Sequence, residues 1–599
     1  MSHTVSNQQL TKGGAFLIQD TLPVNVFIPE EFSEEQLQLA KMCEDFINAE
    51  IYPNLEKIDK MEDNIMVKIL DKSADLGLLG LSIPEEYGGY GMDFTTNMLT
   101  SEVLGASHSF AVALMAHTGI GTLPILYFGN EEQKKKYLPG LASGKLKASY
   151  CLTEPGSGSD ALGAKTKAVL SEDGKHYLIT GQKMWITNAG FADVFIVFAK
   201  IDGEKFTGFI LERSMPGITF GEEEKKMGIK GSSTRQVFFN EVKVPVENIL
   251  GEIGKGHKIA FNILNIGRIK LAAATLGAAK KCSSASIQYA NERHQFNKPI
   301  ASFGAIKHKI AEQIIRIYTL ESATYRATND ISETEKINLT NGMSFNDALL
   351  GAAEEYSVEC AMLKVAGSEA LDYVVDEGVQ IFGGMGFSAE APMDRAYRDA
   401  RINRIFEGTN EINRMLTVDM IMKKAMKGQL DLLTPAMAVQ KELLSIPDFN
   451  EGRGGVFLEY EKFMIKNFKK AILMTAGAAA QKLMQKLAHE QEILMNIADM
   501  CIWTYLAEST LIRVEKIAQI KGHEQVELPL AILKTYIHDV ADYINLAGKN
   551  AICAFASGDE LKMMLLGIKR FTKHDPLNTK ELRRKIADAA IQKGSYLFA

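Results

Sequence analysis

The sequence predicts an α+β fold that is mostly helical, with one β-rich segment between helical regions. Apolar residues recur every three or four positions before residue 147 and again after residue 251, which is typical of amphipathic helices. Between residues 148 and 246, short runs with β-strand character replace that period. The chain has 599 residues, of which 46% are hydrophobic. Because this exceeds what one hydrophobic core normally holds, roughly three or four domains are expected.

The first predicted domain, residues 30–147, is helical. Its clearest helical period covers residues 66–79, and residues 83–89 (IPEEYGG) form a loop because Pro and Gly interrupt the pattern. The second predicted domain, residues 148–250, is a β domain. Strands are expected at residues 167–170, 176–179, 194–199 and 207–211. Asp173-Gly174, between the first two strands, predicts a hairpin.

Helical character returns in the third predicted domain, residues 251–430. Residues 445–455 are rich in Pro, Gly and Asp and predict a linker, after which residues 456–599 form an additional helical domain. The helical periods of the third domain cover residues 259–291, 307–332, 345–367 and 410–424.

Charge and cysteine usage restrict the class of protein. The net charge of -7, without a long basic run, argues against nucleic-acid binding, which needs clustered Lys and Arg. The six cysteines show no CxxC spacing and fit reduced thiols. There is no charged-then-apolar signal at the N-terminus, and no arginine precedes Arg213. The expected location is therefore a bacterial-type cytoplasm, or the periphery of the inner membrane.

Common cofactor and metal motifs do not fit. Residues 251–258 (GEIGKGHK) lack the spacing of a phosphate loop, and the glycines at residues 383–386 lie in helical sequence rather than in a βαβ unit. His489-Glu490 and His523-Glu524 lack a second histidine four residues on. No metal site is expected.

One carboxylate has the surroundings of a general base. Glu407 follows the apolar pair Ile405 and Phe406, which would partly desolvate it and raise its pKa. Gly408 would allow a substrate to approach closely. The alternative is an ordinary surface or helix-terminus carboxylate.

Two further segments are candidates for binding a ring or phosphate. Residues 150–160 (YCLTEPGSGSD) place hydroxyls and a glycine-rich turn after a short apolar strand, although an ordinary loop is an equal alternative. In residues 181–188, Trp185 and Thr187 fall on one face of a strand. The alternative for Trp185 is a buried core residue.

These segments, taken in order, resemble the acyl-CoA dehydrogenase family over about residues 30–425. The resemblance implies an N-terminal helical domain, a middle antiparallel β domain and a C-terminal four-helix bundle, here with the additional helical domain. The motifs are YCLTEPGSGSD from Tyr150, KMWITNAG from Lys183, RHQF from Arg293 with KPI from Lys298, QIFGGMGF from Gln380, and RIFEGTNEI from Arg404.

The resemblance implies FAD as cofactor, with contacts from two subunits and therefore at least a homodimer. Thr409 and Glu411 match the segment beside the adenosine half of FAD. Positions that line the flavin are matched by Tyr150, Leu152, Thr153, Gly158, Ser159, Trp185 and Thr187. Positions that reach the FAD of a neighbouring subunit are matched by Arg293, Gln295, Phe296, Gln380, Gly383 and Gly384.

Substrate residues follow from the same resemblance. Asn265 and Arg268 match the acyl-CoA-binding helix, Ser159 lies near the thioester side, and Gly408 adjoins the substrate. Glu407 matches the catalytic base. In some branches of the family the base lies just before the arginine matched by Arg268, and here that position is Gly267.

The implied function is FAD-dependent α,β-dehydrogenation of medium- to long-chain fatty acyl-CoA to trans-2-enoyl-CoA in fatty acid β-oxidation, with electrons passed to an electron-transfer flavoprotein. Residues 264–268 (LNIGR), residues 224–230 (EKKMGIK) and the extra helical domain are most similar to the very-long-chain branch. The alternatives are an acyl-CoA oxidase and a scaffold or assembly protein of low activity on the same fold.

The last domain has two interpretations. Phe457, Met464 and Phe468 recur at helical spacing, which favours a helical bundle that covers the main body. The alternative is peripheral membrane contact through the segment before the linker. The residues of that segment are Lys423, Lys424, Met426, Lys427, Leu430, Leu432 and Leu433.

Overall fold

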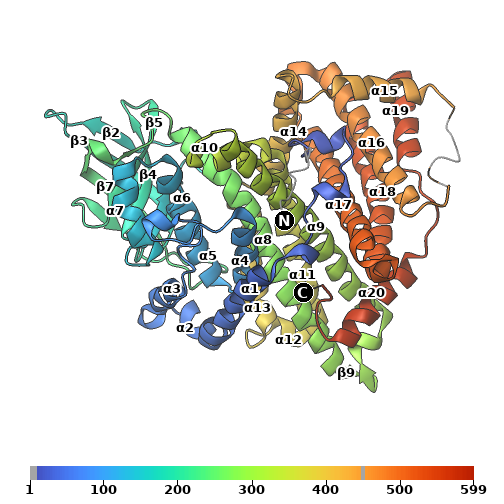
Figure 1. The fold of residues 1–599 in the computed structure, drawn as a ribbon, viewed down its shortest axis with the longest axis horizontal. Coiled ribbons are helices and arrows are strands. Elements are labelled where there is room, and N and C mark those ends of the chain that lie inside the picture. The colour runs from blue at the N-terminus through green and yellow to red at the C-terminus, as the bar shows by residue number, and fades with distance from the viewer. Residues whose placement is uncertain (1–9, 447–451, 453, 599) are drawn as a thin grey trace, which may run out of the picture.

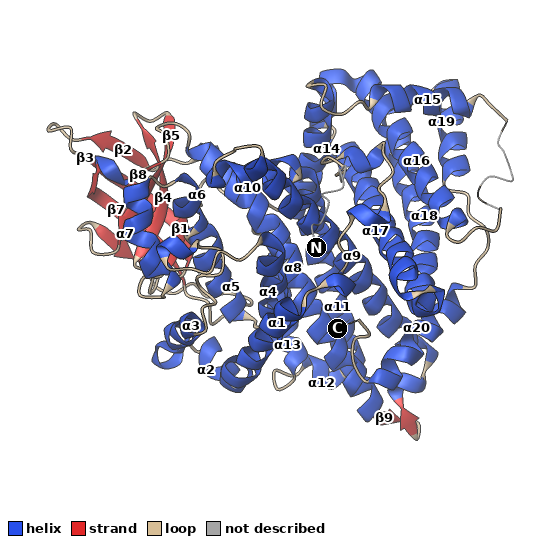
Figure 2. Ribbon diagram, in the orientation of Figure 1, coloured by secondary structure: helices blue, strands red, loops and turns tan. Residues whose placement is uncertain are grey.

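The computed structural model describes residues 10–446, 452 and 454–598. Helices make up most of it, and one β-sheet stands at one end (Figure 2). The C-terminal helices form the opposite side of the molecule (Figure 1). This arrangement confirms the predicted α+β, mostly helical fold class. Of the predicted linker, residues 447–451 and 453 lie outside the described residues.

The N-terminal region is helical, and side-chain caps start several of its helices. Ser33, Asp93 and Asn130 each accept a hydrogen bond from the backbone N-H three residues on, which satisfies a free donor at a helix start. The helix predicted at residues 66–79 ends early, because Gly77 adopts a left-handed φ of 78°. The helices are α1 (Glu34–Phe46), α2 (Leu55–Asp59), α3 (Ile65–Asp75), α4 (Phe94–Gly105), α5 (Ser109–Met115), α6 (Leu123–Phe128) and α7 (Glu131–Ala142).

The middle region is a sheet with the order β6-β7-β3-β2-β4-β5-β8, and β1 pairs with β4. Most pairs are antiparallel, as expected, but β1 and β2 each pair with β4 in parallel. The predicted hairpin joins β2 to β3, with Gly174 at a left-handed φ of 67°. The strands are β1 (Ala148–Cys151), β2 (Lys167–Leu170), β3 (His176–Thr187), β4 (Val194–Ile201), β5 (Lys205–Glu212), β6 (Ile218–Phe220), β7 (Thr234–Pro245) and β8 (Ile249–Leu250).

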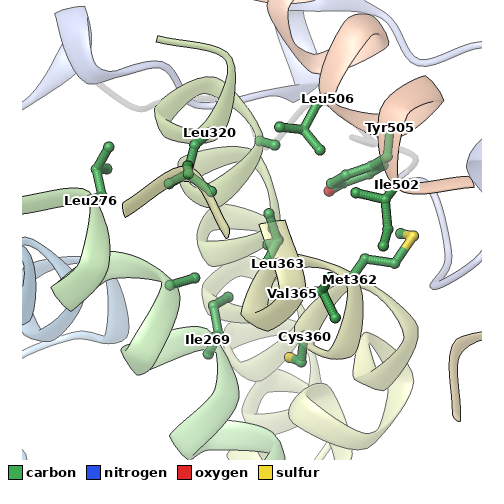
Figure 3. Packing of buried hydrophobic residues seen from close by; sticks show 14 of the residues in the cluster. Ile269, Leu276, Leu320, Cys360, Met362, Leu363, Val365, Ile502, Tyr505 and Leu506 are labelled. Carbon is green, nitrogen blue, oxygen red and sulfur yellow. The ribbon is translucent and has the colours of Figure 1, made fainter. Parts of the chain in front are cut away.

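Long helices form the centre of the molecule, where α11 packs against α8, α9 and α14. Figure 3 shows the packing of buried apolar residues there, with Ile269 and Leu276 from α8, Leu320 from α9, and Leu363 and Val365 from α11. The elements are α8 (Gly256–Glu292), β9 (His294–Gln295), β10 (Lys298–Pro299), α9 (Gly304–Thr340), α10 (Phe345–Glu355), α11 (Ser357–Phe382), α12 (Gly384–Phe387), α13 (Pro392–Ala400) and α14 (Asn410–Met426).

The C-terminal helices pack on this body mainly through α17, which contacts α9, α11 and α14. The helical-bundle interpretation of the last domain is therefore confirmed. Its helices are α15 (Leu433–Leu443), α16 (Glu459–Leu483), α17 (Gln491–Lys521), α18 (Glu527–Phe555), α19 (Gly558–Phe571) and α20 (Thr579–Lys593).

Part of the segment considered for membrane contact is not on the surface. Lys424 pairs with Glu355 at 2.8 Å, and Leu430 is buried. Two helical stretches, Ser109–Phe128 and α8, are long and apolar enough to cross a membrane, but most of their residues are buried inside the protein. Both are therefore explained as core helices of this fold.

Candidate active site

Glu407 lies in a strained turn just before α14. Glu407 and Gly408 both have left-handed backbones, with φ of 58° and 83°. For glutamate this conformation costs on the order of 1–3 kcal/mol and persists only where the surroundings enforce it. Thr409 then starts α14, because its Oγ1 accepts a hydrogen bond from the N-H of Ile412 at 3.2 Å.

Polar side chains from two helices, α14 and α11, hold this turn. Asn413 Nδ2 donates to the carbonyl oxygens of Gly408 at 2.8 Å and Thr409 at 3.0 Å. Asn410 Oδ1 accepts from Lys364 Nζ of α11 at 2.8 Å. Sequence reasoning did not identify Asn410, Asn413 or Lys364. The two asparagines lie in or beside the Glu407 motif and could have been predicted as turn residues. No feature of the neighbouring sequence distinguishes Lys364 from other lysines.

The Glu407 carboxyl group is desolvated. Its Oε2 is buried and has no hydrogen-bond partner among the described residues. Burial raises the pKa of Glu407 to about 7, although the cations Arg268 and Lys364 act in the opposite direction. Desolvation was expected from Ile405 and Phe406. For Ile405 this was wrong, because its side chain is 47% exposed. Phe406 does line the apolar cavity with Glu407, together with residues of α8 and α11.

A cavity of about 180 Å³ lies against Glu407 and runs between the N-terminal helices, α8 and α11. One stripe of α8 lines it, with residues repeating every three or four positions. Gly267 belongs to this stripe, and a Cβ atom there would lie 2.8 Å from Glu407 Oε2. Position 267 and Glu407 therefore face the same point, and a side chain at 267 would displace the carboxyl group.

The β domain also contributes residues near Glu407. Thr187, the last residue of β3, lines the cavity with Glu407. The hydroxyl of Tyr150 is buried without a partner among the described residues, and burial together with the nearby Glu407 raises its pKa. Trp185 is 62% exposed, so the alternative of a buried core tryptophan is wrong. The cause is a bulge between Lys183 and Ile186, where Trp185 adopts a φ of 55°.

The loop after β1 is fixed by an ion pair that sequence reasoning missed. Lys183 of β3 is fully buried and its Nζ lies 2.7 Å from Glu154 Oε1. Glu154 also accepts from the backbone N-H of Lys165 and Thr166. Residues Leu152 and Thr153 beside it are half-buried, whereas Gly158 and Ser159 are exposed. Both members of the pair lie in motifs quoted above, but their mutual contact has no local signature.

Comparison with known proteins agrees with this geometry. Family models described as the N-terminal, middle and C-terminal domains of acyl-CoA dehydrogenase match residues 33–145, 149–242 and 254–422, and a second C-terminal domain model matches residues 467–570. A Bacillus subtilis (strain 168) protein named "Probable acyl-CoA dehydrogenase" is 47% identical over 585 residues, which is 98% of each chain. The chain belongs to the acyl-CoA dehydrogenase family.

Two other relatives place it within that family. The crystal structure of an acyl-CoA dehydrogenase complexed with FAD from Bacillus anthracis superimposes with a TM-score of 0.95 at 47% identity, covering 98% of this chain and 100% of that one. The human mitochondrial very long-chain specific acyl-CoA dehydrogenase is 40% identical over 402 residues, 65% of this chain and 58% of its own length. The resemblance seen in the sequence is confirmed, and the protein is an oxidoreductase of the acyl-CoA dehydrogenase class.

In this acyl-CoA dehydrogenase, the remaining flavin candidates form a separate group far from the sheet (Figure 1). Arg293, Gln295 and Phe296 lie on or beside the β9-β10 hairpin, where Phe296 is 86% exposed. Gln380, Gly383 and Gly384 lie at the exposed end of α11. Stacking of Tyr289 on Phe382, with ring centroids 4.0 Å apart, joins the two helix ends that carry these segments. One chain thus does not bring this group to Tyr150, Thr187 and Glu407.

Asn265 and Arg268, the candidates for substrate binding, are buried in α8. Arg268 Nη1 donates to Asn265 Oδ1 at 2.8 Å, and Arg268 Nε faces the carbonyl oxygen of Glu407 at 3.4 Å. In this acyl-CoA dehydrogenase, Arg268 therefore positions the turn that carries Glu407. Glu411 is exposed in the first turn of α14.

The residues present fit a flat aromatic cofactor such as FAD. Trp185 offers an exposed ring beside the Thr187 end of β3, and Tyr150 leaves a buried hydroxyl without a partner among the described residues. A buried hydroxyl without a partner is costly unless a ligand bonds to it. The exposed indole ring provides a surface on which a flat ligand can stack.

Proposed function

We propose that the protein catalyses FAD-dependent α,β-dehydrogenation of medium- to long-chain fatty acyl-CoA to trans-2-enoyl-CoA in fatty acid β-oxidation. The observation that carries the proposal is the buried, unpartnered carboxyl group of Glu407, with a pKa of about 7, on a largely apolar cavity shared with Thr187. The FAD complex of the Bacillus anthracis relative supports the cofactor. The similarity to the human very long-chain enzyme supports the longer substrates.

In the proposed reaction Glu407 removes the α-proton of the acyl thioester. A base with a pKa near 7 is half ionised at neutral pH, which suits proton abstraction. The backbone N-H of Glu407 has no acceptor among the described residues, so it is free to donate to the thioester carbonyl oxygen. FAD, when bound, supplies the acceptor for the hydride that leaves the β-carbon. Tyr150, Leu152, Thr153, Gly158, Ser159, Trp185, Thr187, Thr409 and Glu411 are the residues proposed to hold it.

The test is anaerobic titration of the FAD-loaded protein with saturated acyl-CoAs of increasing chain length. Loss of the flavin absorbance with formation of enoyl-CoA is expected, and preserved absorbance with every acyl-CoA would reject the proposal in favour of a scaffold role. Reoxidation by an electron-transfer flavoprotein rather than by oxygen is expected for a dehydrogenase. Rapid oxygen consumption would instead indicate an acyl-CoA oxidase.

We further propose a homodimer located in the cytoplasm, with peripheral contact to the inner membrane. The dimer is supported by the position of the β9-β10 hairpin, which lies far from the sheet in Figure 1. Arg293 beside this hairpin and Gln380 near the end of α11 would complete the site of a partner chain. The exposed apolar side chains Met426, Leu433 and Leu444 support the membrane contact.

Liposome sedimentation tests the membrane contact. Substituting Met426, Leu433 and Leu444 by Ser is expected to leave the protein in the supernatant, while the unchanged protein sediments with anionic vesicles. The matched control substitutes Met563 and Leu566 of α19, which are also exposed but lie outside this segment. Equal sedimentation of all three proteins would contradict the contact.

A further inference from the structure

Lys270 is a buried cation that the proposed reaction does not use. It belongs to the stripe of α8 that lines the cavity, and only 8% of its surface is exposed. No described residue forms a hydrogen bond or an ion pair with its ammonium group. Burial lowers the pKa of Lys270 to about 8, and no charged neighbour contributes to that shift. A buried ammonium group without a partner is costly, which makes the position unusual.

The place of Lys270 relative to the base follows from the helix. Gly267 lies beside the Glu407 carboxyl group. Lys270 follows three residues later on the same face, about 5 Å further along the helix axis. The cavity continues beyond it along α8 to Ala274, Ala278 and Cys282. An acyl chain whose α-carbon meets Glu407 would therefore pass the ammonium group part-way along its length.

The surroundings of Lys270 change from apolar to polar on one side. Lys270 also lines a small second pocket, where Ser82, Asn97, Thr100 and Ser101 supply polar atoms. These side chains bond mainly to one another and to the carbonyl oxygen of Asn97, and none of them bonds to Lys270. Lys270 thus lies between the apolar cavity and a pocket with polar atoms, which suits binding of a charged group at the end of a chain.

Three other ionisable residues on the main cavity differ from Lys270 because each contacts another side chain; they are His108, Asp399 and Lys281. His108 Nδ1 lies 3.0 Å from Asp399 Oδ2, and Lys281 lies over the ring of Tyr52 at 4.9 Å. These side chains therefore already have interaction partners in the protein. Lys270 is a cation on the cavity wall for which the described residues provide neither a counter-ion nor an aromatic ring.

We propose that Lys270 determines specificity by binding a carboxylate at the far end of the acyl chain, so that the enzyme prefers ω-carboxyacyl-CoA of medium length over the unsubstituted chain. This inference rests on the proposed function of the same cavity. The bound carboxylate would be the missing partner of the ammonium group, and charge-assisted pairs of this kind are stronger than neutral hydrogen bonds. Unsubstituted chains would bury apolar methylene groups against an unpaired cation and lose affinity.

The decisive experiment compares kcat/KM for ω-carboxyacyl-CoA and unsubstituted acyl-CoA of the same carbon number, for the FAD-loaded enzyme and its Lys270→Met variant. Met keeps the length of the side chain and removes the charge. The variant is expected to lose about 10- to 100-fold on the carboxylated chain and to gain on the unsubstituted one. Lys562→Met, at an exposed position of α19 outside the cavity, is the control and is expected to leave the ratio of the two values unchanged.

Binding without turnover separates this inference from the proposed function. In a Glu407→Gln background, calorimetry with the ω-carboxyacyl-CoA is expected to show the same 10- to 100-fold loss, on the order of the kinetic effect, when Lys270→Met is added. An equal Kd with and without Lys270→Met would overturn the inference, as would a kinetic ratio that Lys270→Met leaves unchanged. Absence of flavin bleaching with both substrate classes would reject the proposed function alone, and calorimetry would still decide the role of Lys270.

Discussion

Glu407→Gln is expected to slow the reduction of bound FAD by acyl-CoA by on the order of 10⁴-fold, because the amide keeps the shape of the side chain but cannot accept the α-proton. FAD should stay bound, since the buried Oε2 makes no hydrogen bond among the described residues and its loss breaks no contact. Stopped-flow absorbance of the flavin measures the rate. Bleaching of the variant as fast as the parent enzyme would remove Glu407 from the mechanism.

The same residue sets the expected pH dependence. Burial raises the pKa of Glu407 to about 7, and only the ionised form is a base, so kcat/KM should rise with pH and level off above about 7. Lys364 lowers the pKa of Glu407, and Lys364→Met should therefore move the midpoint to higher pH. A profile that is flat between pH values well below and well above 7 would contradict this assignment.

Position 267 offers a positive control for the location of the base. A Cβ atom at Gly267 would lie 2.8 Å from Glu407 Oε2, so a carboxylate introduced there would occupy nearly the same space. Glu407→Gly combined with Gly267→Glu is expected to recover part of the activity that Glu407→Gly alone loses. Glycine also suits the left-handed backbone at 407. Recovery would show that the place of the carboxylate, rather than its residue number, matters.

The sequence was sufficient to predict those elements that depend only on neighbouring residues. Strand β2 was predicted with its observed bounds, and Asp173-Gly174 placed the hairpin, because turn residues and alternation act over a few positions. Glu407 was predicted to be a base from its motif, and the structure places it on the cavity. The exposed position of Trp185 was harder to predict. A bulge interrupts the strict alternation of side chains along the strand there and gives Trp185 a left-handed backbone.

Contacts between distant segments had no such signal. Lys364 and Glu407 are 43 positions apart, and nothing around Lys364 indicates that its charge acts on Glu407. The raised pKa of Glu407 was likewise assigned only to its neighbours Ile405 and Phe406. Phe406 lines the cavity with Glu407, but residues of α8 and α11 line it as well. Periodicity indicates that a helix has a buried face but does not identify the helix that covers it.

The packing of the C-terminal helices on the main body is the clearest example of a contact between distant segments. Arg513 of α17 is 1% exposed, with Nη1 2.6 Å from Glu321 of α9 and Nη2 2.8 Å from Glu30 of the N-terminal segment. Arg513→Ala is expected to lower the free energy of unfolding by about 3–5 kcal/mol, because it leaves two carboxylates with one cation fewer in a buried position. Urea denaturation followed by circular dichroism measures the loss.

Two controls distinguish the effect of burying the ion pair from the effect of removing a charge. Lys562→Ala breaks an ion pair with Asp559 in which both side chains are largely exposed, and its cost should stay below about 1 kcal/mol. Arg513→Met together with Glu321→Met and Glu30→Gln removes the charges as a set and should be less harmful than Arg513→Ala, because no carboxylate from these residues is left buried without its arginine. Lys280, which also pairs with Glu321, is compensated by Glu102 at 2.6 Å in that variant. A cost of Arg513→Ala no larger than that of Lys562→Ala would mean that apolar packing alone holds α17 on α9.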